Sequence, residues 1–106
     1  MSIAKQRRQI DAIDRKLVKL LNARARRSLV IGRAKQAAGL PLFHRQRERQ
    51  IAENVRHANG GPLPDAALEH IFEQILRATR KAVRRMLHRE KLRARGRPKK
   101  SRAAAR

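Results

Sequence analysis

Residues 2–38 read SIAKQRRQIDAIDRKLVKLLNARARRSLVIGRAKQAA, a run without proline in which Gly32 is the only glycine. Apolar side chains recur at three- and four-residue intervals from Ile10 to Ala34, which is the spacing of one helix face. The run therefore predicts a single long helix, which at a rise of about 1.5 Å per residue would extend about 55 Å. A chain of 106 residues has too little remaining sequence to cover such a helix. We therefore expect a second copy of the chain to lie beside it.

Two shorter patterns follow and predict two further helices. Gly39-Leu40-Pro41 ends the first helix, because glycine suits a helix terminus and proline cannot continue one. The second helix is expected from about His44 to His57, and the turn sequence NGGPLP at residues 59–64 follows it. Asp65 is expected to be the N-cap of a third helix, whose apolar positions recur from Leu68 to Leu87. The sequence shows no strand pattern, so we expect an all-α fold with three helices per chain.

Positive charge dominates the composition and is concentrated near the end of the sequence. The chain has 29 Lys and Arg against eight Asp and Glu, a formal net charge of +21. Residues 91–106, KLRARGRPKKSRAAAR, contain no acid and are expected to form a basic, disordered tail after a domain at residues 1–90. Such a tail would contact nucleic acid non-specifically through phosphates. Residues 95–100, RGRPKK, resemble an AT-hook, so a DNA-binding protein is one alternative.

Several other classes of protein and site are disfavoured by composition. Aromatic residues are 2% of the chain, which argues against a nucleic-acid surface built on base stacking. The absence of cysteine excludes disulfides, thiol nucleophiles and sulfur-ligated metals. The histidines lack metal-ligand spacing, so no metal is expected. The sequence contains neither a secretory signal pattern nor an apolar run of bilayer length, so we expect no membrane association and a cytoplasmic location.

The charged residues of the first two helices do not all face the same way. Arg24 and Lys35 lie within about 40° of each other on the first helix, and Arg7 points well away from them. Arg47 and Glu48 begin the inner side of the second helix. This arrangement alone fits both a solvated basic face and a pocket for a small anion.

Six features, in this order and at these separations, resemble the all-helical chorismate mutase family over roughly residues 3–87. They are R-x-x-I-D-x-I-D at Arg7–Asp14, L-x-x-L-L-x-x-R at Leu17–Arg24, I-G-R-A-K at Ile31–Lys35, the helix break at Pro41, R-E-R at Arg47–Arg49 and I-F-x-x-I-L-x-x-T at Ile71–Thr79. The resemblance implies an intertwined homodimeric helical bundle with antiparallel first helices and two active sites, each built from both subunits. It also implies that the substrate is a small dicarboxylate, chorismate, which is rearranged to prephenate.

The resemblance implies roles for five charged residues. Arg7 of the partner chain, Arg24 and Arg47 would bind the two carboxylates, which match the planar fork of a guanidinium. Lys35 would donate to the ether oxygen and to a carboxylate, and Glu48 would accept from the ring hydroxyl. Of these, Lys35, Arg24, Arg47 and Glu48 form the expected catalytic set. The rearrangement is intramolecular, so catalysis would rest on conformation and electrostatics, with no cofactor.

Three further positions complete the expected substrate-binding set. Thr79 lies where the family has a small hydroxyl residue near a carboxylate. His44 stands where many members have an acid, and Val83 stands where many have Gln or Glu. Valine cannot donate a hydrogen bond to the ether oxygen, and loss of such a donor typically costs ~10²–10³ in rate. The alternatives are a slow mutase, a donor elsewhere, or a related enzyme, either an isochorismate pyruvate lyase or a 4-amino-4-deoxychorismate mutase.

Overall fold

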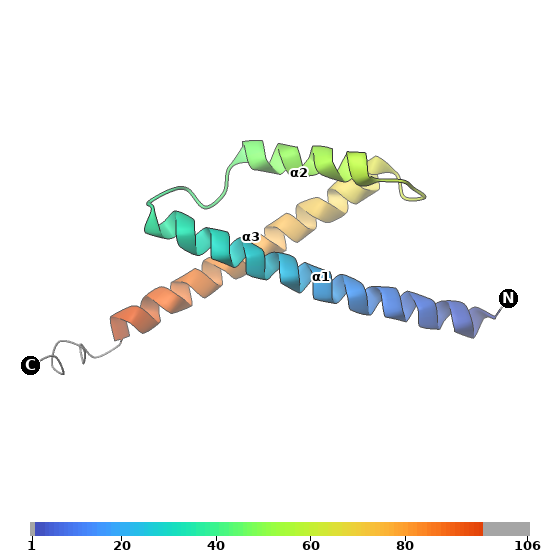
Figure 1. Ribbon diagram of the computed structural model, residues 1–106, viewed down its shortest axis with the longest axis horizontal. Coiled ribbons are helices and arrows are strands. Elements are labelled where there is room, and N and C mark those ends of the chain that lie inside the picture. Colours follow the sequence, from blue (N-terminus) through green and yellow to red (C-terminus); the bar gives the residue numbers. More distant parts are fainter. Residues whose placement is uncertain (1, 97–106) are drawn as a thin grey trace, which may run out of the picture.

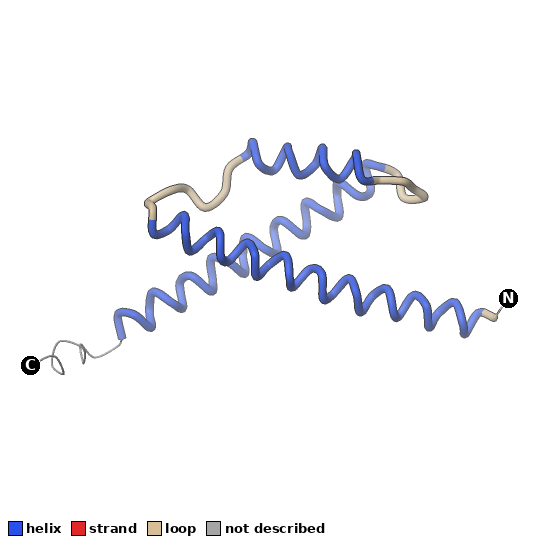
Figure 2. The backbone as a smooth tube through the Cα atoms, viewed as in Figure 1, coloured by secondary structure: helices blue, strands red, loops and turns tan. Residues whose placement is uncertain are grey.

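The computed structural model describes residues 2–96, which form three helices (Figure 1). They are α1 (Ile3–Ala37), α2 (Arg45–Ala58) and α3 (Asp65–Gly96). Between them lie two loops, and this part of the chain contains no strand (Figure 2). The predicted all-α fold with a long first helix is confirmed, since α1 has 35 residues.

The helix boundaries follow local signals, with one correction at the start of α3. At the start of α1, the Ser2 hydroxyl caps the helix by accepting from the amide of Lys5 at 3.2 Å. Just after the end of α1, Gly39 has a φ of 69°, a backbone conformation that favours glycine. The prediction that Asp65 is the N-cap of α3 is wrong by one residue. The carbonyl of Pro64 already accepts the amide of Leu68 at 3.2 Å, so Asp65 lies in the first turn, where its charge complements the helix dipole.

The third helix is longer than the sequence pattern predicted. Helical structure continues through Gly96, so the expectation of disorder is wrong for residues 91–96. Lysine, leucine, arginine and alanine fill residues 91–95, and all are strong helix formers even without an apolar stripe. The expected domain boundary at residue 90 stays a prediction. Residues 97–106, with most of the AT-hook-like segment, lie outside the described residues.

α3 is the helix against which both others pack. Figure 1 shows the middle part of α3 crossing the second half of α1, with α2 beside the first half of α3. Gly32 of α1 is buried at this crossing, where a Cβ atom would lie 3.0 Å from Val83 Cγ1 and 3.4 Å from Leu87 Cδ1. Val83 and Leu87 are only 1% and 2% exposed. Glycine at this position therefore allows the two helices to approach closely.

An ion pair joins the same two helices farther along α3. Arg33 of α1 donates to Glu90 of α3, with Nη2 and Oε2 2.6 Å apart. The hydrogen bond from Arg33 is the main cause that lowers the pKa of Glu90, although partial desolvation opposes it. The pair adds a polar tie between the helices beyond the apolar crossing.

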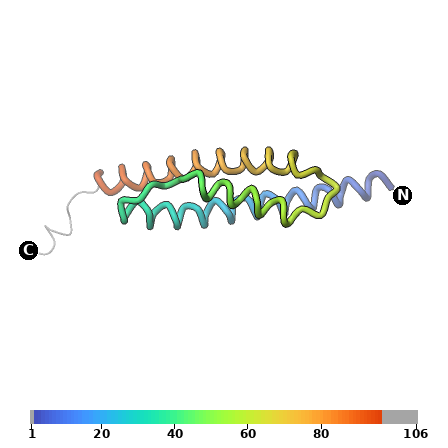
Figure 3. The backbone as a smooth tube through the Cα atoms, turned by 90° about the horizontal axis from the view of Figure 1, so that it is seen from above, coloured from blue at the N-terminus to red at the C-terminus, as the bar shows by residue number. Residues whose placement is uncertain are grey.

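Most of the apolar surface of α1 is not covered by its own chain. Ile10, Ile13 and Leu17 are each more than half exposed. The first part of α1 extends past both other helices (Figures 1 and 3). This exposed apolar stripe is the surface that the expected second copy would cover.

We predict that Gly32→Val destabilises the protein. The new side chain would overlap Val83 and Leu87, and overpacking of this kind typically costs about 1–3 kcal/mol in the free energy of unfolding. Urea denaturation would measure the loss. Ala34→Val is the matched control, because it adds a β-branched residue at an exposed position of the same helix. Equal unfolding free energies for the two variants would contradict the close-approach role of Gly32.

Candidate active site

A cavity of about 230 Å³ lies where the second half of α1, the α1–α2 loop, α2 and α3 meet. Its lining is partly polar and partly apolar. Seven of the eight residues predicted from the sequence line it: Arg24, Lys35, His44, Arg47, Glu48, Thr79 and Val83. The structure therefore brings into one place groups contributed by all three helices.

The two cations of α1 enter the cavity from the same helix face. Ser28 and Ile31 lie between Arg24 and Lys35 on this face and also line the cavity. Lys35 is partly buried, and its ammonium donates to the carbonyl of Leu42 in the α1–α2 loop at 3.3 Å. One of its three protons is thereby used, and two remain for a ligand.

Arg24 and Arg47 place two positive charges next to each other. Burial, and then the charge of Arg47, lower the pKa of Arg24 below its ordinary value. Arg47 donates to Gln50 Oε1 at 2.8 Å, and neither arginine forms an ion pair with another residue in the range 2–96. A bound anion would relieve the repulsion between them, and their planar guanidinium groups suit carboxylates.

His44 has a structural function at the cavity rim. It is the N-cap of α2, and its Nδ1 accepts from the amide of Arg47 at 3.4 Å. An aspartate at this position could also accept from that amide, so His44 caps the helix without adding a negative charge to the cavity rim. The neutral ring that caps in this way carries its proton on Nε2.

Thr79 and Val83 lie one turn apart on the buried face of α3. Thr79 is 8% exposed, and Val83 packs against Gly32. The valine therefore lines the cavity while it also forms the helix crossing. Its side chain is a hydrocarbon, so position 83 of α3 supplies no hydrogen-bond donor to the cavity.

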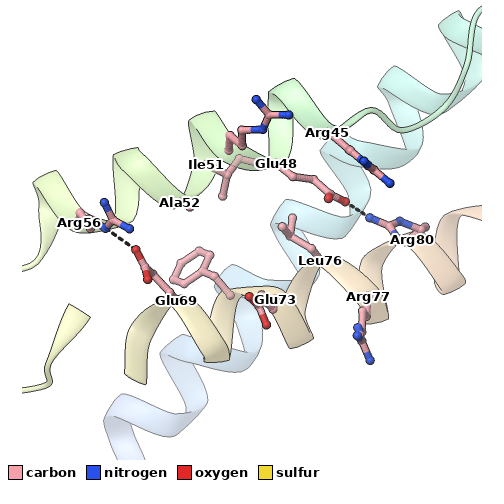
Figure 4. A pocket seen from close by; sticks show the side chains of 12 residues that line it. Arg45, Glu48, Ile51, Ala52, Arg56, Glu69, Glu73, Leu76, Arg77 and Arg80 are labelled. Carbon is pink, nitrogen blue, oxygen red and sulfur yellow. Dashed lines mark hydrogen bonds and ion pairs between the residues drawn. The ribbon is translucent and has the colours of Figure 1, made fainter. Parts of the chain in front are cut away.

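Arg80 is a cavity residue that the sequence reasoning missed. Its Nη2 forms an ion pair with Glu48 Oε1, which joins α3 to α2 (Figure 4). The guanidinium also lies over the ring of Phe43, with Cζ 5.2 Å from the ring centroid. α3 contains many basic residues, so the sequence pattern does not distinguish Arg80 from the other arginines as a site residue. The only clue is its position directly after Thr79, which was predicted to bind the substrate.

A second cavity, of about 560 Å³, opens between α2 and α3. Figure 4 shows its lining, in which Arg56 pairs with Glu69 at one end and Arg80 pairs with Glu48 at the other. Glu48 and Arg80 also line the smaller cavity, so their ion pair lies where the two cavities meet.

Arg7 is the one predicted residue that does not line the cavity. It is exposed on the projecting part of α1, 17 positions before Arg24 and thus about 25 Å away along the helix. It cannot reach the site of its own chain. Its expected place in the partner's site stays a prediction.

The described residues show neither a membrane-spanning helix nor a metal cluster. No helix within residues 2–96 is long and apolar enough to cross a bilayer. The same part of the chain holds no group of three or more histidine and acidic side chains placed to bind a metal ion.

The chain is similar to part of several curated proteins that are named for two activities. The chain is 41% identical over 76 residues to the "bifunctional chorismate mutase/prephenate dehydratase" of Aquifex aeolicus, and 31% identical over 70 residues to that of Neisseria gonorrhoeae. These alignments cover 68% and 66% of this chain but 21% and 19% of the relatives. The chain thus spans about a fifth of their length.

Solved structures with the same arrangement of helices are chorismate mutases. Form II of the Thermus thermophilus enzyme has a TM-score of 0.76 and 30% identity, covering 78% of this chain and 94% of that one. Form I has a TM-score of 0.71 and 31% identity, covering 73% and 96%. Residues 6–84 match the family described as chorismate mutase type II. The chain therefore belongs to the chorismate mutase type II family.

Proposed function

We propose that this chain rearranges chorismate to prephenate, in a site completed by a second copy of the chain. The observation that carries the proposal is the cavity in which Arg24, Lys35, Arg47 and Glu48 meet. It combines an excess of positive charge with one carboxylate and an apolar wall. That combination suits a small ring compound with two carboxylates and one hydroxyl group.

The arginines supply binding and conformational selection. Arg24 and Arg47, which both line the cavity, each bind a carboxylate, and holding the two carboxylates there favours the compact conformer in which the reacting carbons meet. The burial that lowers the pKa of Arg24 also removes water from around its charge. Electrostatic attraction to the substrate is stronger there than in bulk water.

Lys35 supplies the electrostatic part of catalysis. Negative charge develops on the ether oxygen as the carbon–oxygen bond breaks, and an ammonium donor stabilises that charge. The hydrogen bond to Leu42 holds Lys35 in place before the substrate arrives, so little reorganisation is needed. Since Val83 provides no second donor, Lys35 carries most of this stabilisation.

The other interpretations of the sequence receive no specific support. An isochorismate pyruvate lyase or a 4-amino-4-deoxychorismate mutase would use the same cavity, and no contact in it favours either reaction. Nucleic-acid binding through residues 91–106 and a cytoplasmic location stay predictions. The AT-hook hypothesis depends mainly on residues 97–100, which lie outside the described residues.

A second copy of the chain explains both Arg7 and the exposed stripe. Ile10, Ile13 and Leu17 lie on the same projecting segment as Arg7. An antiparallel partner that covers these side chains would bring its own Arg7 toward this cavity. The homodimer thus accounts for the apolar surface and for the missing third arginine together.

The decisive test of activity is to incubate the protein separately with chorismate, isochorismate and 4-amino-4-deoxychorismate, and to identify the products by chromatography. We expect prephenate from chorismate. Lys35→Ala should reduce kcat by ~10³ or more, because a charged donor at the ether oxygen is lost. Lys19→Ala, at an exposed position on the same helix, is the control and should retain activity. Full activity of Lys35→Ala, or no conversion of any compound by the wild type, would refute the assignment.

Val83→Gln should raise kcat by up to ~10², because it adds a donor near the ether oxygen. The new side chain must extend into the cavity, since Gly32 lies directly behind Val83. Its amide will cost stability when no substrate is bound, so melting temperatures should accompany the rates. Val83→Leu adds bulk without a donor and is the matched control. The donor argument fails if a folded Val83→Gln protein is no faster than Val83→Leu.

Arg7→Ala and Arg24→Ala chains should complement each other. Each variant alone should be nearly inactive, whereas a mixed dimer has one site that retains both arginines. Mixing them after partial unfolding should therefore restore up to about a quarter of wild-type activity, since half of the dimers are mixed and each has one intact site. Activity is measured with chorismate, and sedimentation gives the oligomeric state. A fully active monomer would exclude the shared site.

A further inference from the structure

Two contacts hold the guanidinium of Arg80 beside Glu48. Nη2 pairs with Glu48 Oε1, and Cζ lies over the ring of Phe43, 5.2 Å from the ring centroid. Nε is buried and has no hydrogen-bond partner among the described residues. The side chains of Arg80 and Glu48 are 32% and 37% exposed, so the pair is partly withdrawn from water. Its position is set by the protein before any ligand binds.

This contact changes the charge that a ligand meets at Glu48. On the proposed function, Glu48 accepts from the group at ring position 4 of the substrate. In chorismate that group is a neutral hydroxyl, and in 4-amino-4-deoxychorismate it is an ammonium at neutral pH. A free carboxylate would bind the ammonium more strongly, because opposite charges attract. A carboxylate already compensated by a guanidinium loses that advantage.

The ammonium would also meet direct repulsion. To reach Glu48 it would share one carboxylate with Arg80, which places two positive charges within a few ångströms of each other in a partly desolvated site. A hydroxyl donates to the second carboxylate oxygen without such a penalty. The local geometry therefore favours the neutral group.

The charge balance of the whole cavity favours the same substrate. Four cations, Arg24, Lys35, Arg47 and Arg80, line it together with one carboxylate, Glu48. Chorismate carries two negative charges, whereas its 4-amino relative carries a net charge of minus one. The excess of positive charge attracts the dianion more strongly.

We propose, resting on the function proposed above, that Arg80 is a specificity-determining residue that makes the site accept a 4-hydroxyl and reject a 4-ammonium group. It acts through Glu48 and through its own charge. Its effect is therefore a ratio between two substrates and not a general loss of activity.

The test compares chorismate with 4-amino-4-deoxychorismate in two ways, by kcat/KM and by calorimetric binding at low temperature. The wild type should favour chorismate by at least about tenfold. Arg80→Met keeps the length of the side chain but removes the charge, and it should reduce this preference by about tenfold. Arg80→Lys restores a charge and should retain most of the preference, even if packing on Phe43 is lost.

Arg84→Met is the matched control. Arg84 lies on the same helix and over the same Phe43 ring, with Cζ 5.5 Å from the centroid, but it does not line the cavity. This variant should leave the preference unchanged, and melting temperatures show whether each variant folds. An unchanged ratio in a folded Arg80→Met protein, or wild-type binding of the amino compound as tight as that of chorismate, would overturn the inference.

The two readouts separate this inference from the proposed function. If the wild type binds both compounds but converts neither, the mutase assignment fails, and the binding ratio still decides the role of Arg80. If the wild type binds neither compound, the inference is overturned as well. If it converts chorismate but Arg80→Met shows the same ratio, the inference alone fails.

Discussion

The close approach of α1 to α3 at Gly32 is the constraint on which the rest of the structure depends. A Cβ at this position would lie 3.0 Å from Val83, which is closer than almost all Cβ contacts in proteins, so glycine allows this approach without displacing the neighbouring side chains. The crossing places Arg24 and Lys35 of α1 opposite Thr79 of α3, so the walls of the cavity and the core are made by the same contact. Two of the buried residues, Thr79 and Val83, also line the cavity. The same contacts therefore stabilise the fold and shape the site.

The site gathers like charges, which a folded protein normally avoids. Arg24 and Arg47 repel each other, and burial adds to the cost. The neighbouring Glu48–Arg80 pair is neutral as a unit and adds no net charge, although it orients a carboxylate. The cavity thus has a positively charged region at Arg24 and Arg47 beside the neutral ion pair of Glu48 and Arg80. A dianionic ligand matches this uneven field better than a uniformly basic surface would.

The fold could be predicted from local sequence, whereas two key contacts could not. Helical period, the Gly39 break and the turn before Asp65 determine the three helices, and the resemblance identified seven of the residues that line the cavity. The Gly32–Val83 and Glu48–Arg80 contacts join positions far apart in the sequence, and no periodicity links them. The prediction for the end of α3 was wrong because residues 91–95 favour helix by intrinsic propensity alone, without an apolar face to reveal it.

The projecting first part of α1 has a consequence for how the protein responds to its own concentration. In the proposed dimer, the apolar stripe of α1 is covered only by another copy, so folding and association form a single equilibrium. The unfolding midpoint would then rise with protein concentration. If each site also takes Arg7 from the other copy, as proposed, dilution would lower the fraction of complete sites. At low protein concentration, doubling the concentration would then more than double the total activity.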